Sequence, residues 1–124
     1  MTRTFIFLSA VFGGLSVAAG AFGSHALRDK LVERSLEVFE TAVRYQMYHA
    51  IALLGVALLL IRTEFNSALI FAGWSFTVGI LLFSGSLYTL SLTDIKTLGA
   101  VTPLGGVAFM AGWLAVAIAA FNFK

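Results

Sequence analysis

The chain has 124 residues, of which 60% are hydrophobic and 11% are charged, with a formal net charge of +2. A soluble domain is typically about 45–50% apolar and about 25% charged, so this chain carries too few charges to cover a water-exposed surface and is expected in a lipid bilayer. The absence of cysteine excludes a disulfide scaffold and a thiolate metal site. The basic residues are dispersed, which argues against nucleic acid as a partner.

The first apolar run covers residues 4–22 and contains no charge. About 20 helical residues cross a hydrocarbon core of about 30 Å, so this run predicts the first membrane span. A cleaved signal peptide is the alternative, with Arg3 as its basic region. The run exceeds the usual 7–15 residues of a signal core, and its small-residue pairs, such as Gly14/Ala18, favour close packing of a retained helix.

Residues 27–43 form an amphipathic segment. Apolar residues recur at helical spacing on one face, and seven charged residues between Arg28 and Glu40 occupy the other. The pattern predicts a separate helix that lies in the membrane interface. The alternative is an N-terminal extension of the next span that projects into water.

Three further apolar runs follow, at residues 45–61, 68–92 and 103–121, with polar turns at 62–67 and 93–99. Thr102 and Pro103 are suited to the N-cap and first turn of the last helix. We therefore predict an all-α fold in one integral membrane domain, residues 1–124. This fold is a four-helix bundle with an additional interfacial amphipathic helix between spans one and two.

The distribution of basic residues predicts the orientation. Four spans place five of these residues on one side of the membrane and three on the other, namely Arg28, Lys30, Arg34, Arg44 and Lys96 against Arg3, Arg62 and Lys124. Because cytoplasmic loops carry the excess of Lys and Arg, both termini are predicted to be extracytoplasmic.

The polar side chains near one end of the predicted bundle form a candidate cluster. Ionisable groups inside membranes mark functional sites by default. The cluster comprises His25, Arg44, Tyr45, Gln46, Tyr48, His49, Tyr88, Asp94 and Thr102. His49 could equally be a structural histidine bonded to a carbonyl or a tyrosine, a proton relay, or one ligand of a weakly supported zinc site.

No residue pattern predicts catalysis, a cofactor or a bound metal. The glycines are expected to be packing notches where helices approach closely. Those singled out are Gly14, Gly20, Gly23, Gly79, Gly85, Gly105, Gly106 and Gly112.

Several blocks resemble the signature of a known family. They are residues 20–27 (GAFGSHAL), 39–50 (FETAVRYQMYHA), 85–88 (GSLY) and 98–106 (LGAVTPLGG), with Gly112-Trp113. Together they are similar to the domain-of-unknown-function 423 family, small bacterial inner-membrane proteins with a related animal transmembrane protein. The resemblance implies a four-span protein of the plasma membrane and transfers no activity.

Two functional hypotheses remain. The first is an oligomeric small-solute or ion permease or a lipid-binding protein, motivated by the one-sided polar cluster and the small-residue faces. The second is an accessory or assembly subunit of a larger membrane complex. The expected partners are the lipid bilayer and either further copies of the chain or another membrane protein, and no enzymatic role is expected.

Overall fold

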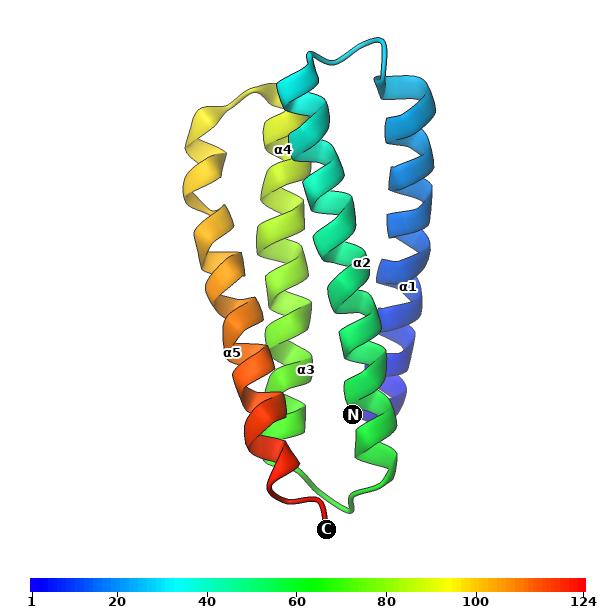
Figure 1. The fold of residues 1–124 in the computed structure, drawn as a ribbon, viewed down its shortest axis with the longest axis vertical. Helices are drawn as coiled ribbons and strands as arrows, with labels where there is room; N and C mark the ends of the chain where they lie inside the picture. Colours follow the sequence, from blue (N-terminus) through cyan, green and yellow to red (C-terminus); the bar gives the residue numbers. More distant parts are fainter.

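The computed structural model describes residues 1–124 and is built from helices joined by short connections (Figure 1). Four helical rods are long and apolar enough to cross a membrane, which confirms the predicted four spans. The first rod is α1 (Thr2–Phe22) with the π-helical turn η1 (Gly23–Leu27), and the second is α2 (Glu33–Ile61). The third rod consists of α3 (Ser67–Gly79), the π-helical turn η2 (Ile80–Ser84) and α4 (Gly85–Thr93). The fourth rod consists of the 3-10 turn η3 (Lys96–Ala100) and α5 (Thr102–Ala120).

The predicted interfacial helix is not a separate element. Residues 27–43 are divided among the end of the first rod, a connection at 28–32 and the first turns of α2. From Glu33 to Ile61, α2 is one continuous helix that runs beside the other rods (Figure 1). The structure therefore corresponds to the alternative, an extension of the second span beyond the apolar core. The apolar residues of the extension pack along the bundle, and Phe39 is buried against η1 and α4.

The rods alternate in direction, and each packs on its neighbour in the chain. α1 lies along α2, α2 lies against the rod formed by α3, η2 and α4, and that rod lies along α5 (Figure 1). Because the backbones of α2 and α5 scarcely approach each other, a seam that side chains bridge remains between them, with the α3–α4 rod as its floor. This seam is the feature of the fold that positions the site described below.

Phenylalanine rings fill glycine notches between the rods. A methyl group at Gly112 would collide with the Phe76 ring, and one at Gly79 would collide with the Phe109 ring, so α3 and α5 exchange one ring each. Larger residues at these glycines would separate the helices, and dispersion contacts would be lost.

The outcome for the other predicted packing glycines is mixed. Gly105 lies directly on the backbone of Phe83, Gly23 lies close to a phenylalanine ring, and Gly20 and Gly106 make ordinary contacts. Gly14 and Gly85 were predicted to pack but have open space around them, because those sides of the helices face outward. Gly73, which was not predicted, holds the ring of Phe5.

Side-chain hydrogen bonds also hold α1 to α2. The Ser9 hydroxyl donates to the carbonyl of Ala50 at 2.7 Å, and the Ser16 hydroxyl donates to that of Val43 at 2.8 Å. In lipid, helix association lacks a hydrophobic driving force, so close packing and bonds of this kind hold the rods together.

Candidate functional site

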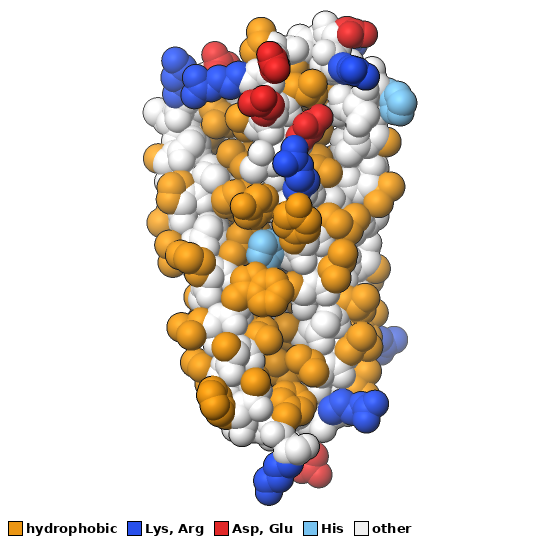
Figure 2. All heavy atoms as spheres, in the orientation of Figure 1, with side chains coloured by type: hydrophobic (Ala, Val, Ile, Leu, Met, Phe, Trp, Pro, Cys, Tyr) orange, Lys and Arg blue, Asp and Glu red, His pale blue; other side chains and the backbone are white.

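A groove of about 550 Å³ occupies the seam between α2 and α5. The face shown in Figure 2 has hydrophobic side chains above and below a histidine near its middle. Aromatic and aliphatic side chains form most of the groove wall. The lining residues are Tyr45 and His49 from α2, Phe83 from η2, and Pro103, Gly106, Val107, Phe109, Met110 and Trp113 from α5.

His49 is fixed in the groove wall by both ring nitrogens. Its Nδ1 lies 2.7 Å from the carbonyl of Tyr45, one turn earlier, and its Nε2 lies 3.1 Å from Nε1 of Trp113. A carbonyl can only accept and an indole N–H can only donate, so Nδ1 carries the proton and Nε2 accepts. This arrangement requires a neutral imidazole with no nitrogen left for a metal or a proton relay.

Stacked rings hold the two sides of the groove together. The His49 ring stacks on Phe109 of α5 with centroids 3.5 Å apart and planes 7° from parallel. The Tyr45 ring stacks on Phe83 with centroids 4.7 Å apart. Rings pack as rigid bodies with few rotamers, so the groove is preformed rather than collapsed.

The π-helical turn η2 shapes the groove floor. Such a turn inserts one residue into a helix, and π-helical turns are frequent at functional sites. Here Phe83 points into the seam, and the next residue, Ser84, donates a hydrogen bond to the carbonyl of Ala42 in α2 at 2.7 Å. The turn thereby anchors the floor to α2 while presenting a ring to the groove.

Gln46 and Tyr88 form a second polar group, away from the groove. The Tyr88 hydroxyl donates to Oε1 of Gln46 at 2.7 Å, and Nε2 of Gln46 donates to the carbonyl of Phe12 at 2.8 Å. Gln46 is buried, and its amide links α1, α2 and α4. These two residues of the predicted cluster therefore connect three rods.

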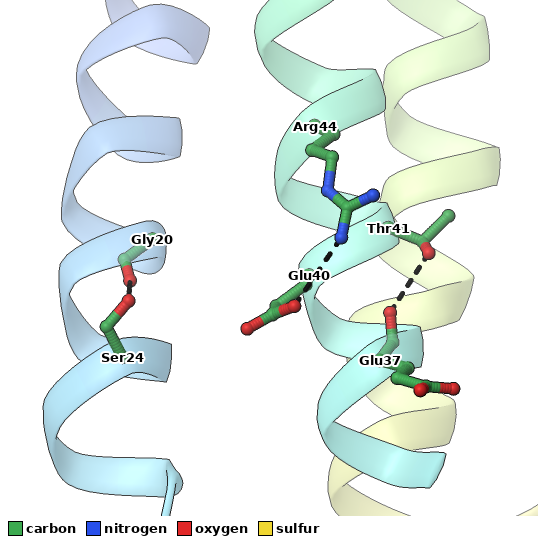
Figure 3. Close-up of polar contacts among 6 residues, drawn as sticks. All are labelled: Gly20, Ser24, Glu37, Glu40, Thr41 and Arg44. Atoms are coloured by element: carbon green, nitrogen blue, oxygen red, sulfur yellow. Dashed lines mark hydrogen bonds and ion pairs between the residues drawn. The ribbon is translucent and has the colours of Figure 1, made fainter. Parts of the chain in front are cut away.

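Arg44 lies among exposed charges on the early turns of α2. Its guanidinium pairs with Glu40 at 3.5 Å, with both side chains exposed, and the Thr41 hydroxyl donates to the carbonyl of Glu37 (Figure 3). The figure also shows Ser24 at the end of the first rod, where its hydroxyl donates to the carbonyl of Gly20. An exposed pair of this kind stabilises a helix only slightly.

The rest of the predicted cluster is dispersed. His25 and Tyr48 are exposed, Asp94 is exposed at the left-handed end of α4, and the Thr102 hydroxyl bonds to that of Ser86 at 2.7 Å. Figure 2 shows the two histidines at different heights, one near charged side chains at the upper end and the other lower among hydrophobic ones. The nine residues of the predicted cluster therefore do not come together in one site, and no three His, Cys, Asp or Glu side chains are grouped so that they could hold a metal ion.

Sequence reasoning missed most of the groove. Of its nine lining residues, only Tyr45, His49 and Gly106 were predicted as members of the polar cluster or as packing glycines. A usable signal was present in α5, where Phe109 and Trp113 are one turn apart and belong to the same wall.

Comparisons with known proteins agree with this architecture. Residues 19–106 match the model of a family described as protein of unknown function (DUF423). The chain is 46% identical over 121 residues to the UPF0382 membrane protein YwdK of Bacillus subtilis, with 98% of each chain covered. It is 46% identical to the UPF0382 membrane protein SH2409 of Staphylococcus haemolyticus, again with 98% of each covered. No solved structure matches the chain.

Proposed function

The chain belongs to the DUF423 family of proteins of unknown function, and we propose that it is a membrane protein that binds a bilayer lipid, with an apolar chain of that lipid held in the α2–α5 groove. The groove is the observation that carries this proposal. Its volume of about 550 Å³ lies within the range of about 300–1,000 Å³ that is usual for small-molecule sites.

The chemistry of the groove wall favours a hydrocarbon. The polar atoms of His49 and Trp113 are bonded to each other and to the backbone, so neither side chain offers a free donor or acceptor to a polar solute. The remaining wall consists of rings, aliphatic side chains, one glycine and the phenol of Tyr45. Lipid tails are as apolar as this wall, so selectivity for a chain arises from packing against preformed rings.

The permease hypothesis gains less support from the structure. Phe5, Phe76 and Leu53 are fully buried in the centre of the fold, so a polar path would have to run between copies of the chain. The accessory-subunit hypothesis predicts a stoichiometric protein partner after purification. A lipid in the groove is compatible with either a monomer or an oligomer.

We also propose that the protein lies in the bacterial plasma membrane with both termini outside. Five basic residues flank the spans on the side of the α1–α2 connection and three on the side of the termini, so the first side is placed in the cytoplasm. The lipid in the groove then belongs to the cytoplasmic leaflet.

Fluorescence of Trp113 tests the groove directly. The chain has two tryptophans, so Trp74→Phe leaves Trp113 as the reporter on the groove wall. Phosphatidylcholine with brominated chains should quench this reporter saturably in detergent micelles at low lipid content. Trp113→Phe leaves Trp74 on α3 as the control reporter, whose quenching should follow bulk lipid content without saturation.

A matched pair of substitutions separates the groove from the general lipid surface. Gly106→Leu projects a side chain into the groove from a position where a Cβ has only an ordinary contact, 4.0 Å from the Phe83 ring. Gly14→Leu adds the same side chain to an open face of α1. Gly106→Leu should abolish saturable quenching, and Gly14→Leu should preserve it. Quenching of Trp113 that never saturates, or that Gly106→Leu leaves unchanged, would refute lipid binding in the groove.

A further inference from the structure

A second cavity, of about 540 Å³, lies at the charged end of the same seam. It is enclosed by the first turns of α2, the last turn of α4 and the connection to α5. The lining residues that matter here are Arg34, Ser35 and Val38 of α2, Leu90 of α4, and Asp94 and Lys96 beyond its end. Only three of its nine lining residues are hydrophobic, against six of nine in the groove.

The cavity carries basic groups without protein partners. Arg34 and Lys96 both line it, whereas the one ion pair in the structure joins Arg44 to Glu40 elsewhere on α2. Asp94 is the only acidic lining residue and forms no ion pair with either cation. The lining therefore has a net charge of +1, which favours an anion with a single negative charge.

Backbone and hydroxyl donors add to this preference. α2 begins after Val32 without a side-chain cap, and the first helical N–H group with a carbonyl partner is that of Leu36. Arg34 and Ser35 both line the cavity, their N–H groups precede this first bonded group, and the Ser35 hydroxyl makes no hydrogen bond within the protein. Glu33 shares this turn but does not line the cavity. Free N–H groups beside two cations suit a phosphate oxygen.

The cavity and the groove are aligned along the seam. Val38 lines the cavity and Tyr45 the groove, and a spacing of seven residues places both on one face of α2. Leu90 lines the cavity and Phe83 lines the groove, and these two residues are likewise seven positions apart on the rod formed by α3, η2 and α4. From Arg34 to Tyr45 the rise along α2 is about 16 Å, close to the thickness of one leaflet of a hydrocarbon core of about 30 Å.

We propose that the lipid bound in the seam is an anionic glycerophospholipid with a phosphodiester head group, such as phosphatidylglycerol. Its phosphate lies between Arg34 and Lys96, and its chain extends down the seam into the aromatic groove. This inference rests on the lipid binding proposed above and adds the class of head group.

Head-group preference can be measured with the same Trp113 reporter. In the Trp74→Phe protein, brominated phosphatidylglycerol should half-saturate quenching at about fivefold lower lipid content than brominated phosphatidylcholine with identical chains, the effect of one net basic charge near a membrane surface. Arg34→Gln together with Lys96→Gln should remove this preference, because binding of phosphatidylglycerol, which has a net negative charge, weakens more than binding of phosphatidylcholine, which has none. The control pair Arg28→Gln and Lys30→Gln, two exposed residues outside this cavity, should keep the preference.

Each outcome separates the two proposals. Saturable quenching with equal affinity for both lipids, or a preference that survives Arg34→Gln with Lys96→Gln, overturns the head-group proposal while leaving the groove proposal intact. Equal binding of phosphatidylethanolamine and phosphatidylglycerol overturns the requirement for net negative charge. If added inorganic phosphate abolished the preference for phosphatidylglycerol over phosphatidylcholine, the cavity would be a site for soluble anions, and the head-group proposal would also be overturned. Absence of saturable quenching by every lipid overturns both proposals.

Discussion

Gly105 provides a demanding test of the packing between α5 and the third rod. A methyl group at this position would lie 2.7 Å from Cα and Cβ of Phe83, and closer still to its backbone nitrogen. Carbon atoms rarely approach within 3.4 Å, so Gly105→Ala must displace α5 from η2 by about 0.7 Å or more. A gap of about 0.5–1 Å forfeits a quarter to a half of the dispersion energy of the contacts it opens. We expect a loss of about 1–3 kcal/mol, the usual cost of overpacking.

The loss can be measured by unfolding the purified protein in mixed micelles with increasing dodecyl sulfate, with helicity as the signal. Gly14→Ala is the matched control, because nothing lies within 4 Å of a Cβ at that position. It should change stability by no more than about 1 kcal/mol, in the stabilising direction if helix propensity dominates. If Gly105→Ala were as stable as Gly14→Ala, the close approach of α5 to Phe83 would be wrong.

Three further predictions concern the polar groups and the orientation. Gln46→Leu should cost about 1–2 kcal/mol, because the Tyr88 hydroxyl loses its acceptor and the side-chain bond from α2 to the Phe12 carbonyl of α1 is removed. Tyr88→Phe should cost less in that background than in the wild type when both are measured by dodecyl sulfate unfolding. His49→Ala should preserve membrane insertion but lower stability by about 1–3 kcal/mol, because the Trp113 N–H loses its acceptor; unchanged stability in the same assay would show that the bond contributes nothing. A reporter fused after Lys124 should be active only when it is of the extracytoplasmic type, and activity of a cytoplasm-only reporter there would reverse the orientation.

The four spans could be predicted from sequence because long uncharged runs have few alternatives in a bilayer. The path of residues 27–43 could not. Apolar periodicity shows which face of a helix is buried, but it does not show where the chain reverses. The reversal occurs at 28–32, where Val32 is extended and neither glycine nor proline marks the break. The charged segment consequently continues the second span.

The groove was beyond sequence reasoning for a related reason. Its walls come from α2, η2 and α5, and their meeting depends on the rotation of each helix about its axis. Glycine content alone does not fix that rotation, since Gly14 faces open space and the unpredicted Gly73 holds a ring. The π-helical turn at Ile80–Ser84, which presents Phe83 to the groove, has no recognisable sequence signal.

Photochemical labelling tests lipid binding in the groove most directly. The wild-type protein would be reconstituted with trace phosphatidylglycerol carrying a mid-chain diazirine, irradiated and mapped by peptide mass spectrometry. Val107 and Val17 are chemically identical and comparably exposed, at 59% and 64%, but only Val107 lines the groove. A resident lipid predicts that label at Val107 greatly exceeds label at Val17 and that Gly106→Leu removes the excess. Equal labelling of the two valines would contradict the presence of a bound chain in the groove.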